Sequence, residues 1–395
     1  MEYDFILFEN FYQAFNHYKD VCIIARYLTQ CGYSVAIADV FGEAENCHME
    51  GVPHIIFEKD CPVTFDKNVV RRTDIISNIK NSIKRKQIDK YLVYVMRQLR
   101  GKYKNLYAGS YFVHMTTGWL REIPDTASVY FWGLRSSRLI EYKLNPFSKV
   151  ALQSYRLRRY FDHHQNLKFF VSDEIIRDEF IKIGISRQRL VIRPERYIDA
   201  INSSVTNIES AKELKLLSIG SIRENKRIEC ILDALRPLSD DNITYTIAGK
   251  ASETYEKVIA SHSIEQCGVT RLNYRIPEED FNQLFEQCDF LILCDKQQLS
   301  SVTNGTMNEA LLKGKPIIAP DYNPYKFYIE KFGIGISYDP QSRESLTGAI
   351  MDAKQKGVAF FSENIKNYQR TLLFETVTER FGEELSESLA YTNIL

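Results

Sequence analysis

The chain has 395 residues, of which 44% are hydrophobic and 26% charged, and its formal net charge is zero. This composition excludes a disordered or collagen-like chain, and the length is enough for two domains with separate cores. No apolar run approaches the roughly 20 residues that cross a bilayer, and no signal peptide opens the sequence, so we expect a cytoplasmic protein.

The zero net charge hides an uneven distribution. Residues 1–200 hold 30 Lys and Arg against 23 Asp and Glu, whereas the remainder holds 21 against 28. Between Lys67 and Lys168 there are 21 basic and 6 acidic residues. This basic 67–168 band predicts a surface that faces phosphates, an acidic acceptor or anionic lipid, and a peripheral contact with the inner face of the membrane stays open. No segment matches a recognised nucleic-acid module, so no nucleic-acid partner is expected.

The eight cysteines form no CxxC pair and show no metal spacing. Most of them lie within apolar segments, which favours reduced, buried thiols.

Apolar runs and helical spacing alternate along the first half and predict an opening βαβ unit. Residues 73–104 predict one long helix or a broken pair, in which basic residues are interleaved with apolar ones. A helix that packs one face on the sheet is the favoured interpretation, and a basic surface that rests on lipid is the alternative. The predicted strands of this half are 5–8, 34–39, 53–57, 107–113, 128–132, 167–172 and 189–194.

Two side chains of this half follow predicted strands, where a ligand site would lie. They are His114 and Trp132. His114 is a candidate catalytic residue, although a single His at such a position is more often structural.

The polar segment 201–211 predicts a linker between domains. Beyond it, strands and helices alternate regularly, which predicts a second parallel, doubly wound sheet. We therefore expect an α/β protein with a first domain at 1–200, a second domain at 212–375, and a helix at 376–395 that crosses back to the first domain. The predicted strands of the second half are 215–219, 244–249, 271–276 and 290–294, and its closing helices are 342–354 and 363–389.

Two loops in the second half suit a diphosphate. The first begins with Gly220 and Ser221 and carries Arg223 and Lys226 at the start of a helix. The second is Thr303-Asn304-Gly305, which opens another helix whose N-terminus favours anions. The carboxylate of Glu309 within that helix suits a ribose hydroxyl. Judged on residue type alone, Lys226 and Glu309 would be ordinary surface charges. Their positions on paired loops at strand ends favour a role in ligand binding instead.

These segments resemble glycosyltransferase family 4, which consists of retaining enzymes of the GT-B fold. The resemblance covers most of the chain, is good in the second half and is thin between Val40 and Lys168. It rests on Gly32–Ile37, Phe170–Glu174 with Gly184, Val191–Pro194, Leu217–Gly220 with Lys226, Thr246–Gly249, Ile276–Glu279, Cys288–Leu293 and Glu309–Ala319.

The resemblance implies two Rossmann-like domains that face each other across a cleft, the first (1–200) on the acceptor side and the second (212–375) binding the nucleotide sugar. It also implies a UDP- or GDP-linked sugar donor bound without a metal. It implies that Lys226 holds the donor diphosphate beside Gly220, that Glu309 holds the ribose, and that the backbone at Arg275 and Ile276 flanks the nucleobase. The candidate catalytic residues are then Lys226, Arg223 and His114. Donor-binding candidates are Gly220, Ser221, Lys226, Arg275, Ile276, Thr303, Asn304, Gly305 and Glu309.

The chain departs from the family at several of its motifs. Ser221 stands where the family has an Arg, Ser301 where it has its first Glu, and Trp132 where its His-Gly dipeptide begins. Arg223 and Asp295 are candidate replacements for the Arg and the Glu. The favoured function is transfer of a sugar, with retention, to a glycan or lipid-linked acceptor in cell-surface polysaccharide or glycoconjugate synthesis. The alternative is a GT-B protein that binds a nucleotide sugar or a partner without turnover.

Overall fold

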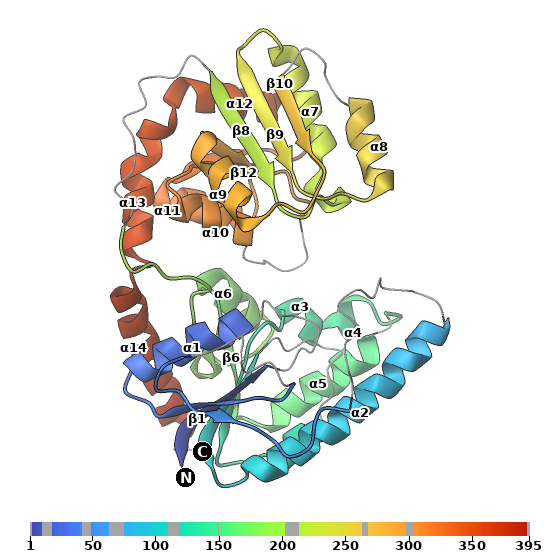
Figure 1. Cartoon of the computed structure of the whole chain (residues 1–395), viewed down its shortest axis with the longest axis vertical. Coiled ribbons are helices and arrows are strands. Elements are labelled where there is room, and N and C mark those ends of the chain that lie inside the picture. The colour runs from blue at the N-terminus through green and yellow to red at the C-terminus, as the bar shows by residue number, and fades with distance from the viewer. Residues whose placement is uncertain are drawn as a thin grey trace. The chain divides into compact units, whose positions relative to one another are not determined.

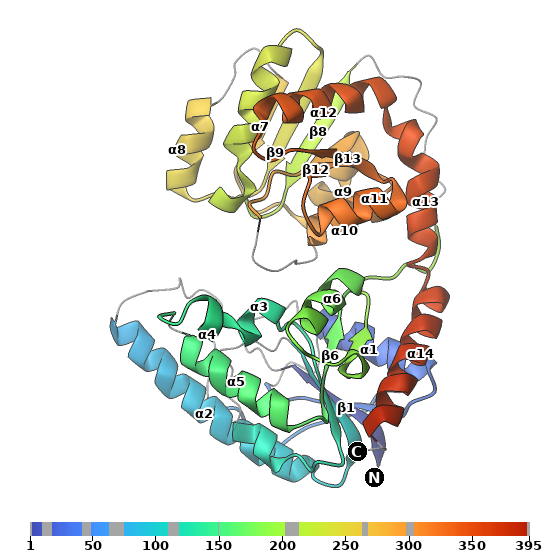
Figure 2. The same ribbon diagram turned by 180° about the vertical axis from the view of Figure 1, so that it is seen from behind.

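The computed structural model describes residues 2–9, 18–41, 49–62, 75–109, 118–148, 150–201, 213–262, 268–297 and 304–392. The chain divides into two compact units. The first comprises Met1–Glu195 with Val377–Leu395, and the second comprises Arg196–Thr376. Each unit is an α/β body in which helices cover a parallel sheet, as the two opposite views show (Figures 1 and 2).

Seven parallel strands form the sheet of the first unit, in the order β3-β2-β1-β4-β5-β6-β7. The strands are β1 (Tyr3–Glu9), β2 (Val35–Ala38), β3 (His54–Ile55), β4 (Tyr103–Gly109), β5 (Ser128–Phe131), β6 (Leu167–Val171) and β7 (Leu190–Ile192). Its helical segments are α1 (Tyr18–Gln30), α2 (Ile75–Leu99), η3 (Gly118–Glu122), α3 (Ser136–Leu139), α4 (Glu141–Leu144), α5 (Ala151–His163), α6 (Glu174–Lys182) and η4 (Arg187–Arg189). Strand order changes direction between β1 and β4, which is the usual place for a ligand in such sheets.

Helix α2 is the long basic helix that the sequence predicts, and it is continuous. Its described apolar side chains Ile88, Leu92, Val95 and Leu99 are buried in the core of the first unit. The predicted boundary is wrong, because the helix ends at Leu99 and strand β4 begins at Tyr103 rather than at Tyr107. The residues from Tyr103 onwards pair in register with β1, and this pairing outweighs the helical charge pattern around Lys104.

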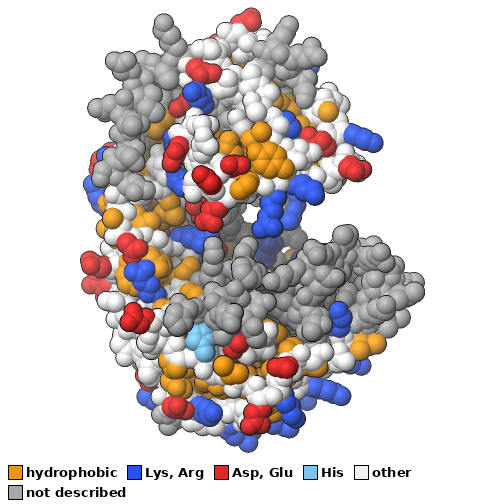
Figure 3. Space-filling model, in the orientation of Figure 1, with side chains coloured by type: hydrophobic (Ala, Val, Ile, Leu, Met, Phe, Trp, Pro, Cys, Tyr) orange, Lys and Arg blue, Asp and Glu red, His pale blue; other side chains and the backbone are white. Residues whose placement is uncertain are grey.

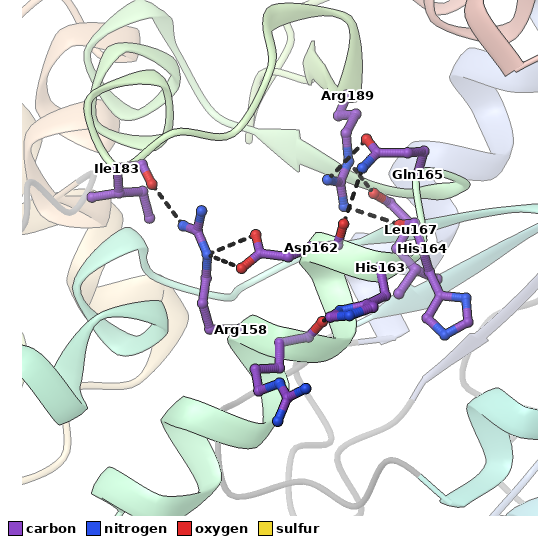
Figure 4. A network of polar contacts seen from close by, with 9 residues as sticks. Arg158, Asp162, His163, His164, Gln165, Leu167, Ile183 and Arg189 are labelled. Atoms are coloured by element: carbon purple, nitrogen blue, oxygen red, sulfur yellow. Dashed lines mark hydrogen bonds and ion pairs between the residues drawn. The ribbon is translucent and has the colours of Figure 1, made fainter. Parts of the chain in front are cut away.

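A buried arginine holds the end of the first unit's sheet together (Figure 4). Arg189 is 3% exposed and donates to the Leu167 carbonyl at 2.8 Å and to the His164 carbonyl at 3.3 Å. The nearby Arg158 bridges Asp162 and the Ile183 carbonyl. Because these guanidinium groups are occupied by backbone and carboxylate partners, this basic cluster serves the fold.

Six parallel strands form the sheet of the second unit, in the order β10-β9-β8-β11-β12-β13. The strands are β8 (Leu214–Ile219), β9 (Ile243–Ala248), β10 (Gly268–Leu272), β11 (Phe290–Ile292), β12 (Ile317–Pro320) and β13 (Gly335–Tyr338). The helical segments are η5 (Glu224–Lys226), α7 (Ile228–Leu235), η6 (Arg236–Leu238), α8 (Glu253–His262), α9 (Glu278–Gln287), α10 (Gly305–Leu312), α11 (Tyr325–Phe332), α12 (Arg343–Lys356), η7 (Val358–Phe361) and α13 (Ser362–Arg370), followed by α14 (Phe374–Thr392).

Two predicted elements of this half are wrong. Strand β10 ends at Leu272, so Arg275 and Ile276 lie in the following loop, because pairing with β9 stops at Ala248. The predicted closing helix 363–389 is two helices, because the chain between them turns at Thr371 and Leu373. There Ile198 forms a parallel bridge with Leu373.

Helix α14 docks on the first unit's sheet through Lys168, which is fully buried on β6. The Lys168 ammonium donates to the Ser388 carbonyl of α14 and lies 3.5 Å from the Tyr130 hydroxyl. Burial, with a smaller contribution from the positive charge of Arg189, lowers the pKa of Lys168 to about 7. The docked helix is therefore linked to the protonation state of one buried amine.

We expect the first unit to gain stability as the pH rises from about 7 towards the unfolded Lys pKa of about 10.4. In that window the unfolded chain keeps the Lys168 proton while the folded chain has lost it, so rising pH favours folding. Chemical unfolding of the wild type and Lys168→Met at pH 7, 8 and 9 measures this. The stability difference between the two proteins should change with pH in favour of the wild type, and parallel pH profiles would rule the linkage out.

The cysteines differ in part from the expectation of reduced thiols. Cys22 on α1 is disulfide-bonded. Cys31, Cys61, Cys230, Cys288 and Cys294 form no disulfide. Among the described helices, none is long and apolar enough to cross a membrane.

Candidate functional site

A polar cavity of about 330 Å³ lies in the second unit, where β8, β11 and β12 end. Four segments contribute to it: the loop after β8, the loop after β11, the start of α10 and the residues that follow β12. This is the carboxyl-end position at which parallel sheets bind ligands. The lining residues are Ser221, Arg223, Asn225, Lys226, Asp295, Lys296, Asn304, Gly305, Thr306, Tyr322, Asn323, Pro324 and Tyr325.

Two glycines bring the ends of β8 and β9 together beside this cavity. Gly220 has φ +105° and Gly249 has φ +139°, and residues with a side chain rarely adopt such positive φ angles. A Cβ on Gly249 would lie 1.8 Å from the Gly220 carbonyl oxygen, so the two backbones are in direct contact. A Cβ on Gly220 would lie 3.6 Å from Thr306 Oγ1 and 4.0 Å from Lys226 Nζ. The bare backbone of Gly220 therefore faces both the lysine and the start of α10.

Lys226 supplies a desolvated positive charge to the cavity. Its Nζ donates to the Ile219 carbonyl at 3.2 Å, which holds the side chain under the end of β8. Burial lowers the pKa of Lys226, and the Asp295 carboxylate opposes that effect. An anion bound beside Gly220 would stabilise the protonated amine further, since an opposite charge at short range is worth more where water is excluded.

Asp295 organises the other side of the cavity. Its Oδ2 accepts from the Tyr325 hydroxyl at 2.7 Å and from Asn304 Nδ2 at 3.2 Å, and its backbone carbonyl accepts from the Tyr322 hydroxyl. Burial and the nearby carboxylate raise the pKa of Tyr325, so this hydroxyl stays protonated and donating. Asp295 thus fixes the start of α10 relative to the segment after β12.

The N-terminus of α10 has fewer open donors than the sequence predicts. The Asn304 side chain caps the helix by accepting from the N–H groups of Thr306 at 3.0 Å and Met307 at 3.1 Å. An anion at this end would meet the Gly305 N–H and the Thr306 hydroxyl, and the dipole of α10 would still favour it.

Five of the predicted site residues line the cavity, namely Ser221, Arg223, Lys226, Asn304 and Gly305, and Gly220 lies beside it. Glu309 lies further along α10, half-buried, with Oε1 3.7 Å from Arg196 Nε. Arg275 and Ile276 are in the loop between β10 and α9 and are not among the lining residues. His114, Ser301 and Thr303 lie outside the described residues.

Sequence reasoning missed the aromatic wall of the cavity. Tyr322, Asn323, Pro324 and Tyr325 line it, together with Asn225, Lys296 and Thr306. The sequence could have predicted this wall. A polar and aromatic stretch directly follows the apolar strand 317–320, and ligands bind where parallel strands end, which is the argument that identified the other loops.

Trp132, the residue at the place of the family's His, has a structural environment in the first unit. Its indole is 8% exposed, and the guanidinium of the fully buried Arg193 lies 4.1 Å from its ring centroid. Arg193 also donates to the Asp20 carbonyl at 2.9 Å. This position therefore presents a packed cation–π pair in place of an imidazole.

The family and structure comparisons agree with this geometry. Residues 202–371 match the family model "Glycosyl transferases group 1". Anabaena HepE in complex with UDP and glucose is 14% identical, with 98% of this chain and 99% of that chain covered and a TM-score of 0.62. The lipopolysaccharide outer core galactosyltransferase WaaB is 14% identical, with 97% of this chain and 98% of that chain covered and a TM-score of 0.63. Sucrose-phosphate synthase from Thermosynechococcus elongatus is 13% identical, with 98% of this chain and 100% of that chain covered and a TM-score of 0.64. A search of curated proteins found no match.

The fold is GT-B, and the matched segment falls within the second unit. The segment 202–371 thus resembles a glycosyl transferases group 1 domain, and the family resemblance that the sequence indicated is confirmed.

Proposed function

We propose that this protein is a glycosyltransferase that moves a sugar from a nucleotide-sugar donor to an acceptor. The observation that carries the proposal is the position of Lys226, whose ammonium lies beside the bare backbone of Gly220 at the end of β8. Support also comes from the matched family and from the UDP bound to the HepE neighbours.

The chemistry needs stabilisation of a leaving nucleoside diphosphate. In our proposal the diphosphate lies between Lys226, Arg223 and the start of α10, so that these groups stabilise the charge as the glycosidic bond breaks. Glu309 would hold the ribose after releasing Arg196. Positive charge from the chain itself makes a metal unnecessary for this step. Transfer with retention, to a glycan or lipid-linked acceptor in cell-surface glycoconjugate synthesis, completes the proposal.

A second candidate is a GT-B protein that binds a nucleotide sugar or a partner without turnover. Two observations favour it. Trp132 is packed under Arg193 at the place of the family's His, and Ser301 replaces the family's first Glu. Among the described residues that line the cavity, the carboxylate is that of Asp295. Its Oδ2 already accepts hydrogen bonds from Tyr325 and Asn304.

Calorimetric titration with UDP, GDP and their glucose conjugates separates these candidates when it is combined with a donor-hydrolysis assay. Binding with release of free nucleotide, unchanged by EDTA, is the expected result for the transferase. Binding without release supports the second candidate. If neither nucleotide binds at millimolar concentration, both are wrong.

We also propose that the first unit rests on anionic lipid through a small protruding surface, the α4–α5 patch. It consists of Leu144 and Phe147, which are 50% and 97% exposed, with Leu152 and Tyr155 on the outer face of α5. Exposed Lys143, Arg156 and Arg159 lie among these side chains. Apolar side chains that protrude between cations suit the interface of an anionic bilayer. On the face in Figure 3, Lys and Arg side chains also lie among hydrophobic ones on the first unit.

Phe147→Ser should reduce co-flotation of the purified protein with phosphatidylserine vesicles at low salt, because it removes the most exposed apolar side chain of the patch. The matched control is Phe360→Ser, which changes an exposed phenylalanine of the second unit. Flotation should weaken as salt rises, since exposed charges are screened within about 10 Å at 0.1 M. No flotation of the wild type at low salt contradicts the lipid proposal. If the protein instead self-associates with rising concentration and Phe147→Ser prevents this, the patch binds a second copy of the chain and the lipid proposal is wrong.

A further inference from the structure

A threonine hydroxyl lies close to Lys226 at the start of α10. Thr306 is the second residue of this helix, is half-buried and lines the cavity. A Cβ built on Gly220 would lie 3.6 Å from Thr306 Oγ1 and 4.0 Å from Lys226 Nζ. Both donors therefore lie on the same side of the bare Gly220 backbone. A phosphoryl oxygen that approaches this backbone from the cavity meets an ammonium and a hydroxyl together.

The hydroxyl is the donor that Thr306 presents to a ligand. The backbone N–H of Thr306 donates to Asn304 Oδ1 at 3.0 Å, so this group is taken up by the helix cap. Lys226 has three N–H donors, and the Ile219 carbonyl accepts one of them at 3.2 Å. An anion beside Gly220 can thus accept from the Lys226 ammonium and from the Thr306 side chain without breaking either contact.

A buried tyrosine of α11 fixes the residue that caps Thr306. The Tyr325 hydroxyl is part of a side chain that is 4% exposed, and it donates to Asp295 Oδ2 at 2.7 Å. Asn304 Nδ2 donates to the same hydroxyl at 2.7 Å and to Asp295 Oδ2 at 3.2 Å. Because two acceptors hold the nitrogen of the Asn304 amide, its oxygen is turned towards α10. Tyr325 therefore acts on the position of Thr306 through Asn304.

We propose that Thr306 is a further catalytic residue and that Tyr325 is the positioning residue that holds it in place. This inference rests on the proposed sugar transfer. The bond between the anomeric carbon and the diphosphate oxygen breaks, and its electron pair stays on the diphosphate. The acceptor oxygen forms the new bond to that carbon and gives up its proton to the diphosphate. Throughout, the Thr306 hydroxyl keeps its own proton and donates a hydrogen bond to the leaving group beside Lys226.

The charge of the leaving group explains why this contact acts on the rate. A hydrogen bond from a hydroxyl to an ionised oxygen is shorter and stronger than one between neutral groups. The diphosphate carries more negative charge in the transition state than in the bound donor, so the contact strengthens as the reaction proceeds. Because the helix cap already holds Thr306, little reorganisation is needed at that moment. Loss of the hydroxyl should therefore lower kcat more than it changes KM.

Substitutions of Thr306 test its role through the release of nucleotide from UDP-glucose and GDP-glucose. Thr306→Val keeps the branched shape without the hydroxyl, and we expect kcat to fall about 10-fold or more. Thr306→Ser keeps the hydroxyl and should retain most of the rate. Thr270→Val is the matched control, because Thr270 is an exposed threonine of β10 that does not line the cavity. It should react at the wild-type rate.

A double-mutant comparison tests whether Tyr325 acts through Thr306. Tyr325→Phe alone should lower kcat about 5-fold, because it removes one neutral hydroxyl from the network. The same change should cost little when Thr306→Val is already present, since the group that it positions is gone. An equal loss in both backgrounds would show that Tyr325 serves only the stability of the fold, and its role as a positioning residue would be wrong.

Melting temperatures of all variants identify any that do not fold, and Thr306→Ala replaces Thr306→Val if the larger side chain is not tolerated. A folded protein without the hydroxyl that keeps the wild-type kcat overturns the catalytic role, while turnover by the wild type leaves the proposed sugar transfer intact. A wild type that releases nucleotide from neither donor overturns both. The two failures are therefore distinguished by the wild-type rate alone.

Discussion

Lys226→Ala is expected to lower donor turnover about 100-fold, corresponding to about 3 kcal/mol of lost transition-state stabilisation. The ammonium is desolvated and lies where the leaving diphosphate gathers charge, so its contact strengthens as the glycosidic bond breaks. The loss should therefore fall mainly on kcat, with a smaller effect on nucleotide affinity.

Release of UDP or GDP from the donor, followed with purified protein, measures this loss. Lys250→Ala is the matched control, because Lys250 is an exposed lysine just after β9 and does not line the cavity. It should retain the wild-type rate. Lys226→Ala protein with an unchanged melting temperature and an unchanged rate would show that the phosphate binds elsewhere.

Gly249→Ala is expected to destabilise the second unit by about 3 kcal/mol or more and to abolish nucleotide binding. The new methyl group would lie 1.8 Å from the Gly220 carbonyl oxygen, and backbone atoms cannot move aside as a flexible side chain does. The φ of +139° adds strain for any residue with a Cβ. Separating the ends of β8 and β9 also displaces Gly220 from Lys226.

Urea unfolding gives the stability change, and UDP calorimetry on the folded fraction gives the effect on the site. Gly348→Ala is the matched control, since this glycine is exposed within α12 and nothing lies within 4 Å of an added Cβ. It should stabilise the chain by about 0.8 kcal/mol, the difference in helix propensity between Gly and Ala. A Gly249→Ala protein as stable as the wild type would show that the two loops separate without cost.

Local patterns in the sequence were sufficient to predict most of the alternation of strands and helices. Buried parallel strands are continuous apolar runs, and a helix that packs on them shows the 3.6-residue period, so each is readable from neighbours in sequence. The loop from Gly220 to Lys226 and the start of α10 at Asn304 were identified in this way, and both line or border the cavity. Boundaries were less predictable from the sequence. Strand β4 begins earlier than predicted, and β10 both begins and ends earlier, because sheet pairing decides them.

The tertiary structure alone decided which distant side chains meet. Asn304 reaches Asp295 and Tyr325, and Lys168 reaches Ser388, which is 220 positions away. The sequence by itself determined an α/β chain with phosphate-suited loops at strand ends, since composition and period report burial. The order of strands in each sheet then determined the contacts, since it brings residues from separate loops to the same edge, and no local pattern encodes that order.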